Sequence, residues 1–173
     1  TVVSLDPAQS SLRLASGDIW QYDRLLIATG AAPMLPKVAG LTDVPYHVLR
    51  SMDDAIHLRQ AMGQARSAIV LGAGLIGMHA AENMAKAKIA VTVVELQPHA
   101  LAGYFEPKAS AIIERTFARN GVRMAMGQTL RSVERQGEGC LATLADGTTI
   151  AADLLLVCTG VKPNIGFLDG SGI

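Results

Sequence analysis

Cysteine is scarce in this sequence, because the 173 residues hold only Cys140 and Cys158. The two lie far apart in the chain and no C-x-x-C pair is present, which argues against a dithiol redox centre within it. We expect both thiols to be free and the protein to work in a reducing cytoplasm.

Metal, membrane and nucleic-acid signals are also missing. The four histidines have no mutual spacing typical of metal ligands, so no metal site is expected. No apolar run approaches the length of a membrane span. The 15 basic and 15 acidic side chains cancel, so no polyanion-binding surface is indicated. Half of the residues are apolar, which predicts a packed core.

The most informative stretch is residues 67–95. A short apolar β-type run leads into a glycine turn of the form G-x-G-x-x-G, which reads Gly72-Ala73-Gly74-Leu75-Ile76-Gly77. A helix-like stretch follows at residues 78–88, and a second β-type run ends at Glu95. This order of strand, glycine turn, helix and acidic strand end is the pattern of a dinucleotide-binding βαβ unit.

Each part of this pattern has a physical role in holding a dinucleotide. Gly72 permits the tight turn, Gly74 lets a pyrophosphate approach the backbone, and Gly77 lets the helix pack closely on the strand. The helix N-terminus offers free N–H groups to the phosphates. Glu95 is placed to accept hydrogen bonds from ribose hydroxyls. A glycine-rich turn without a ligand is the alternative, and the surrounding strand, helix and acid weigh against it.

The rest of the chain predicts an α/β fold, a Rossmann-like parallel sheet with a three-stranded antiparallel meander. Short β-type runs are expected at residues 2–5, 11–15 and 19–22, a buried strand at 23–30, and helices at 51–64 and 106–120. A short strand is expected at 122–125, the meander at 129–135, 140–145 and 148–151, and a further buried strand at 153–159.

An internal repeat links the two buried strands. Residues 14–33 read LASGDIWQYDRLLIATGAAP and align without a gap on residues 144–163, LADGTTIAADLLLVCTGVKP, with nine of twenty positions identical. Such a repeat indicates duplicated units. The second copy closes the unit whose glycine turn begins at Gly72, so the first copy should close a similar unit with a turn upstream of Thr1. We therefore expect a fragment of a longer protein with two tandem dinucleotide-binding domains.

Three ordered motifs, at residues 22–33, at the glycine turn with Glu95 and at residues 153–163, resemble the pyridine nucleotide-disulfide oxidoreductase family of FAD-dependent proteins. In that family an FAD domain is interrupted by an inserted NAD(P)H domain. The resemblance implies four segments: the end of the first FAD-domain segment at 1–36, a linker at 37–50, the NAD(H)-binding domain at 51–160, and the return to the FAD domain at 161–173.

The resemblance also implies site residues. Those expected at the NAD are Gly72, Gly74, Leu75, Ile76, Gly77, Glu95, Thr159 and Gly160, and those expected near the FAD of the longer protein are Thr29, Gly30 and Ala31. Cys158 stands where relatives often have alanine, and we interpret it as a packing residue. His79 stands where many relatives have glutamate; it could bond the nicotinamide carboxamide or pack on the FAD domain.

The activity implied is that of an FAD-dependent NADH oxidoreductase, with hydride passing from NADH to flavin and on to an unidentified acceptor, a small molecule or a redox protein. NADH oxidase, CoA-disulfide reductase, nitrite-reductase and ferredoxin- or rubredoxin-reductase relatives all fit, and such relatives are often homodimers. The short loops and the sequence of the glycine turn favour the nitrite-reductase and NADH-oxidase side. Glu95, followed by no lysine or arginine in residues 96–100, predicts NADH over NADPH. No catalytic residue is identified. The alternatives are a stand-alone NAD-binding module without catalysis, and an interaction domain with a vestigial glycine turn.

Overall fold

The computed structural model describes all 173 residues, which form two compact units. The first comprises Thr1–Ala32 and Val161–Ile173, and the second comprises Pro33–Gly160. The second unit thus includes residues 33–36, expected in the FAD segment, and residues 37–50, expected as a linker. The reason is that the side chains of Leu41 and Val44 are buried in the core of this unit.

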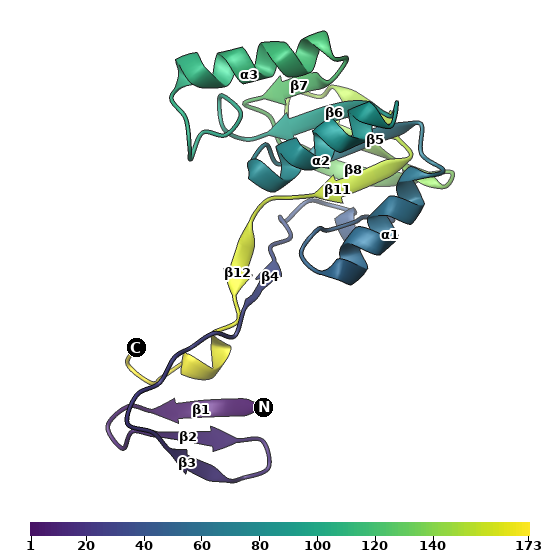
Figure 1. Cartoon of the computed structure of the whole chain (residues 1–173). Coiled ribbons are helices and arrows are strands. Elements are labelled where there is room, and N and C mark those ends of the chain that lie inside the picture. The colour runs from purple at the N-terminus through teal and green to yellow at the C-terminus, as the bar shows by residue number, and fades with distance from the viewer. The chain divides into compact units, whose positions relative to one another are not determined.

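A four-stranded parallel sheet with the order β11-β5-β6-β7 forms the centre of the second unit (Figure 1). Its strands are β5 (Ser67–Leu71), β6 (Ala90–Glu95), β7 (Arg123–Met126) and β11 (Leu154–Val157). The strand that leads into the glycine turn, β5, lies between β6 and β11. The predicted Rossmann-like parallel sheet is therefore confirmed.

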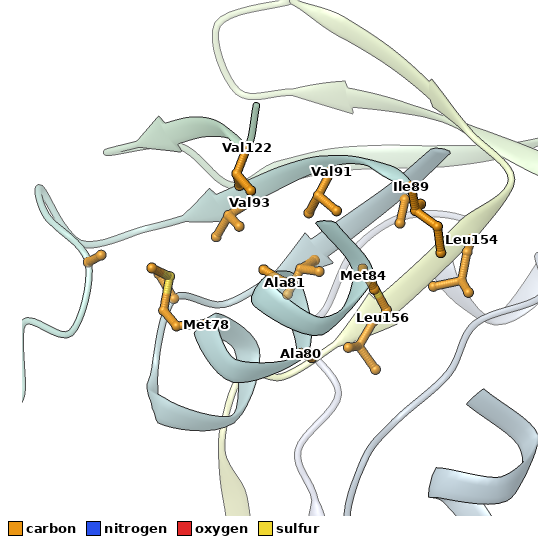
Figure 2. Close-up of a cluster of buried hydrophobic side chains, with 14 of the residues drawn as sticks. Met78, Ala80, Ala81, Met84, Ile89, Val91, Val93, Val122, Leu154 and Leu156 are labelled. Carbon is orange, nitrogen blue, oxygen red and sulfur yellow. The ribbon is translucent and has the colours of Figure 1, made fainter. Parts of the chain in front are cut away.

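Three helices contribute side chains to the core on one face of this sheet: α1 (Met52–Met62), α2 (Leu75–Lys86) and α3 (Pro107–Arg119). Alternate residues of β5, Ala68 and Val70, belong to this core, as the period-2 geometry of a strand requires. Figure 2 shows the part of it beneath α2, where helix side chains meet those of the strands. The labelled residues are Met78, Ala80, Ala81, Met84, Ile89, Val91, Val93, Val122, Leu154 and Leu156.

The meander contributes to the core on the opposite face. It consists of β8 (Leu130–Gln136), β9 (Gly139–Leu144) and β10 (Thr149–Ala152), in the antiparallel order β10-β9-β8 that the sequence predicts. The other alternate residues of β5, Ile69 and Leu71, pack in this second core. Both faces of the parallel sheet are thus covered, which is why its strands are apolar almost throughout.

The helix ends follow the sequence signals. α1 begins with a capping box in which Ser51 Oγ accepts from Asp54 N at 3.1 Å and Asp54 Oδ2 accepts from Ser51 N at 2.7 Å. α3 has its proline in the first turn. The apolar side chain of Ile112 in α3 is 60 % exposed. None of the helices combines the length and apolar character that a bilayer span requires.

The first unit is smaller. It contains the antiparallel sheet β1-β2-β3, built from β1 (Val2–Asp6), β2 (Ser11–Leu14) and β3 (Ile19–Gln21), and the 3₁₀ helix η2 (Gly166–Leu168). The short strand β4 (Ala31–Pro33) pairs with β12 (Val161–Pro163). A second 3₁₀ helix, η1 (Leu41–Asp43), lies within the second unit.

The buried strand predicted at residues 23–30 is wrong for this structure. These residues form no strand, and Leu26 is 88 % exposed. A strand requires a neighbouring backbone to accept and donate its hydrogen bonds. Of these residues only Gly30, at the end, has a backbone–backbone hydrogen bond with another segment, from Asn164 N.

Candidate nucleotide-binding site

The glycine turn joins β5 to α2 at the carboxyl end of the parallel sheet. Gly72 has a φ of 110°, and a Cβ there would overlap the backbone carbonyl of Cys158. A Cβ on Gly77 would overlap the carbonyl of Gly72, so the helix approaches the turn as closely as a glycine allows. A Cβ on Gly74 would meet nothing within 4 Å. Two glycines thus serve close packing, while the third faces open space.

The first turn of α2 leaves its backbone donors unpaired. The first hydrogen bond of the helix runs from Met78 N to Gly74 O at 2.9 Å, and no side chain caps this end. The N–H groups of Gly74, Leu75, Ile76 and Gly77 therefore have no partner within the protein. Free donors and the positive end of the helix dipole favour an anion at this position.

Glu95 ends β6 beside this turn. Its Oε2 accepts a hydrogen bond from Ala73 N at 2.6 Å, and its Oε1 accepts one from Gln97 N at 2.8 Å. The carboxylate is part-buried, and each oxygen keeps acceptor capacity because an ionised carboxylate has about four lone-pair sites. The acidic group that could bind a ribose is thus attached to the glycine turn by a backbone hydrogen bond.

Residues 96–105 follow Glu95 and contain no lysine or arginine. The histidine among them is engaged elsewhere, since His99 Nδ1 lies 3.0 Å from the buried Ser110 Oγ of α3. No cation from this loop is therefore available to pair with a phosphate on the ribose of a bound nucleotide.

Thr159 and Gly160 follow β11, where the chain runs beside Met34. Thr159 Oγ donates to Met34 O at 2.6 Å, and Met34 N donates to Gly160 O at 2.9 Å. The Thr159 hydroxyl proton is therefore already used within the protein. A contribution of these two residues to nucleotide binding would have to come from the backbone or from the hydroxyl lone pairs.

The first unit repeats this arrangement. Thr29 Oγ donates to Asn164 O at 2.7 Å, and Asn164 N donates to Gly30 O at 2.9 Å. Ala31 begins β4 directly afterwards. The three residues expected near an FAD thus lie together on one segment, and the hydroxyl proton of Thr29 is engaged like that of Thr159.

Two further residues singled out by the sequence take different positions. Cys158 packs behind the glycine turn, where its N donates to Leu71 O at 2.7 Å, and burial raises the pKa of its thiol to about 11. His79 lies on the open side of α2 with 78 % of its side chain exposed, and its Nδ1 is 3.8 Å from Glu82 Oε2. A hydrogen bond from Lys86 lowers the pKa of Glu82.

The sequence did not indicate the residues whose hydrogen bonds fix the backbone of the glycine turn. Leu101 N donates to Ala73 O at 2.9 Å, and Glu114 Oε1 accepts from Ala100 N at 2.7 Å. Leu101 adopts a φ of 56°, which is uncommon for a residue with a side chain. A leucine does not by its residue type indicate that conformation. Glu114 is one of several charged residues on α3, and the sequence does not indicate that it contacts the loop.

The profile of the pyridine nucleotide-disulphide oxidoreductase family matches residues 1–173. The match extends over the whole chain, including the glycine turn, both repeat copies and the meander between them. The chain belongs to this family, whose members are FAD-dependent proteins that use pyridine nucleotides, as the sequence motifs indicated.

Among its relatives, the NADH-dependent phenylglyoxylate dehydrogenase subunit epsilon of Aromatoleum evansii is 45 % identical over 170 residues, covering 98 % of this chain and 40 % of the relative. The ferredoxin–NAD(+) reductase component of the biphenyl dioxygenase system of Paraburkholderia xenovorans is 32 % identical, covering 99 % and 42 %. The chain spans about two fifths of the length of these curated relatives.

Solved structures agree with this assignment. The ferredoxin reductase for the CYP199A2 system from Rhodopseudomonas palustris superposes with a TM-score of 0.88 at 32 % identity, covering 99 % of this chain and 43 % of that one. The water-forming NADH oxidase from Lactobacillus brevis, bound to NADH, gives 0.86 at 25 % identity, covering 98 % and 39 %.

Proposed function

We propose that this chain is the NADH-binding part of an FAD-dependent oxidoreductase, in which hydride passes from NADH to flavin and on to an acceptor. The observation that carries the proposal is that two features lie side by side at the carboxyl end of the parallel sheet. Four unpartnered N–H groups begin α2, and the carboxylate of Glu95 lies beside them, joined to Ala73 N. The donors suit a pyrophosphate and the acceptor suits a ribose.

The nucleotide would be NADH rather than NADPH. An NADPH ribose carries a 2′-phosphate, which would approach the carboxylate of Glu95 and be repelled by it. Residues 96–105 supply no lysine or arginine to compensate. Replacing Glu95 by serine and Leu96 by arginine should therefore reverse the preference. An unchanged ratio of NADH to NADPH affinity would show that Glu95 is not the ribose ligand.

The flavin would supply the hydride-accepting ring system. The chain contains one G-x-G-x-x-G turn, which we assign to NADH, so its own share of an FAD site is limited to Thr29, Gly30 and Ala31. Two relatives are described as a ferredoxin–NAD(+) reductase and a subunit of an NADH-dependent dehydrogenase. These descriptions support a redox protein or partner subunit as the electron acceptor.

The first test uses the longer protein that contains this chain. It is mixed without oxygen with NADH, and separately with NADPH, while the flavin absorbance is followed. We expect rapid bleaching by NADH and much slower bleaching by NADPH. Absence of flavin, or no bleaching by either nucleotide, would contradict the oxidoreductase proposal.

A second candidate is a stand-alone NAD-binding module. The observation that favours it is that the donors, the open space at Gly74 and Glu95 all lie within the second unit. A calorimetric titration of the 173-residue chain with NADH distinguishes the two. Tight binding by the chain alone would support a module, and weak binding that strengthens in the longer protein would support a site completed by the flavin domain.

A further inference from the structure

Helix α3 holds the loop of residues 96–105 through two polar side chains on one of its faces. Ser110 and Glu114 are four residues apart and therefore neighbours on the helix surface. Ser110 Oγ lies 3.0 Å from His99 Nδ1, and Glu114 Oε1 accepts from Ala100 N at 2.7 Å. Ser110 and Ala100 are both fully buried, and the two contacts are part-buried.

The loop in turn holds the glycine turn. Leu101, the residue after Ala100, donates its N–H to Ala73 O at 2.9 Å. Ala73 N donates to Glu95 Oε2 at 2.6 Å. Ala73 is thus fixed on both sides, through its N–H by Glu95 and through its carbonyl by Leu101. Its carbonyl shares a peptide plane with Gly74 N, one of the four unpartnered donors.

Leu101 occupies the left-handed region of backbone space with a φ of 56°. A residue with a side chain holds such a conformation only where its surroundings impose it. The imposing contacts are the buried Leu101 side chain, its bond to Ala73 O, and the bond from the preceding N–H to Glu114. The Leu101 carbonyl also accepts backbone hydrogen bonds from Tyr104 N at 2.8 Å and Phe105 N at 3.0 Å. Among all these hydrogen bonds, only the one to Glu114 depends on a side-chain functional group.

We propose that Glu114 is a positioning residue of the nucleotide site, which acts through Ala100 and Leu101 to hold the Ala73 peptide groups of the glycine turn. The proposal rests on the proposed function, since it takes the turn to bind NADH. Glu114 contacts no nucleotide itself. Without it, the loop loses the charged acceptor of Ala100 N, and the donors of the turn must be ordered when the nucleotide binds, which weakens binding.

The test is titration with NADH of the longer protein that contains this chain, as wild type, Glu114→Ala, Glu114→Gln and, as a matched control, Arg115→Ala on the same helix. We expect Glu114→Ala to raise the Kd about tenfold, Glu114→Gln to stay within about twofold because its amide oxygen still accepts, and Arg115→Ala to leave the Kd unchanged. A tenfold change in Kd corresponds to about 1.4 kcal/mol.

The direction in which Glu114→Ala changes the Kd for NADH separates a positioning role from a simple electrostatic effect. Removing a negative charge near a site for an anionic nucleotide should strengthen binding by Coulomb's law. Weaker binding by Glu114→Ala is therefore not a charge effect. Hydrogen exchange supplies a second measurement, in which the amides of Ala100 and Leu101 should exchange faster in Glu114→Ala and as in the wild type in Glu114→Gln.

Three results would overturn the inference. One is a Glu114→Ala protein that binds NADH as tightly as the wild type. Another is Glu114→Gln weakening the binding as much as Glu114→Ala, since the acceptor would then not be the relevant property. The third is a weaker binding explained by unfolding in circular dichroism, which would show a structural role only. If the longer protein with the wild-type sequence fails to bind NADH, the proposed function fails and not this step alone.

Discussion

The two copies of the internal repeat share nine of twenty residues but differ in structure. In the second copy, residues 144–163, Leu156 lies in β11 beside β5 and is 0 % exposed. Its counterpart in the first copy, Leu26, lies in a segment without strand pairing and is 88 % exposed. The same apolar pattern therefore forms a core strand only where a neighbouring strand exists.

The aspartate that opens each segment shows the same contrast. Asp153 Oδ2 accepts hydrogen bonds from Arg66 N at 2.8 Å and Ser67 N at 2.9 Å, which joins the start of β11 to the start of β5. Its counterpart Asp23 accepts no hydrogen bond. Because the donors to Asp153 are Arg66, just before β5, and Ser67, its first residue, an equivalent set of hydrogen bonds to Asp23 needs a β5-like strand.

The threonines behave alike in both copies. Thr29 and Thr159 donate to the carbonyls of Asn164 and Met34 at 2.7 and 2.6 Å. Asn164 and Met34 are themselves counterparts in the repeat, so each copy supplies the acceptor for the other. The two copies agree in the threonine contacts, which each copy makes with the other. They differ in the strand and aspartate contacts, which require a neighbouring βαβ unit.

The largest difference between the copies should appear on truncating the matched leucines. Leu156→Ala is expected to lower the free energy of unfolding of the second unit by about 2–5 kcal/mol, because it leaves a cavity in a closed core. Leu26→Ala is expected to change stability by less than about 0.5 kcal/mol, because the side chain is in water. Urea unfolding followed by circular dichroism measures both. Equal effects would show that residues 23–30 are packed in solution.

The next largest difference between the two copies should appear in cysteine reactivity. Cys158 has alanine as its counterpart at position 28, and burial raises the pKa of its thiol from the ordinary 9.0 to about 11. At pH 8 its thiolate fraction, and so its alkylation by iodoacetamide, should be about 100-fold lower in the folded than in the unfolded protein. Mass spectrometry of labelled peptides follows the rate. Rapid labelling at Cys158 would contradict its assignment as a packing residue, and Cys158→Ala should fold normally.

The raised thiol pKa also has a consequence for stability. The unfolded chain ionises Cys158 above pH 9 while the folded protein keeps it neutral. Its contribution to stability is therefore present below about pH 9 and is lost as the pH rises toward 11.

The aspartates give a smaller effect with the opposite pH dependence. Backbone hydrogen bonds from Arg66 and a side-chain bond from Ser67 lower the pKa of Asp153. Its stabilisation is therefore present above the unfolded pKa, near 4, and is lost as the pH falls through the lower folded value. Asp153→Asn should cost about 1 kcal/mol at pH 7, a modest value because the carboxylate is exposed, and should flatten the acid limb of the stability curve. Asp23→Asn is the control and should leave the free energy of unfolding at pH 7 unchanged.

The smallest effects should come from the threonines, where the copies agree. Thr159→Val and Thr29→Val each remove one hydroxyl donor and keep the shape of the side chain. Each should cost about 0.5–1 kcal/mol, since the freed carbonyls of Met34 and Asn164 lie where water can replace the donor. Unfolding curves of the two variants should shift by similar amounts. A large difference between them would show that the repeat is not functionally symmetric at this position.

Much of the second unit could be predicted from local patterns. The G-x-G-x-x-G turn and the acidic end of β6 each depend on neighbouring residues, and both have the predicted positions. The strand at residues 23–30 could not be predicted correctly, because its formation depends on a partner and not on its own pattern. The exposed position of Ile112 likewise depends on what α3 packs against.

The sequence by itself determined the class of this protein. Glycines at fixed spacing, a following helix and a terminal acid require only local geometry, and together they are the pattern of a dinucleotide-binding turn. The tertiary structure alone decided how that turn is held. The hydrogen bonds from Leu101 N to Ala73 O and from Ala100 N to Glu114 Oε1 join residues on different elements of the chain. No local pattern encodes such contacts, because they exist only once β6, α3 and the loop between them have packed together.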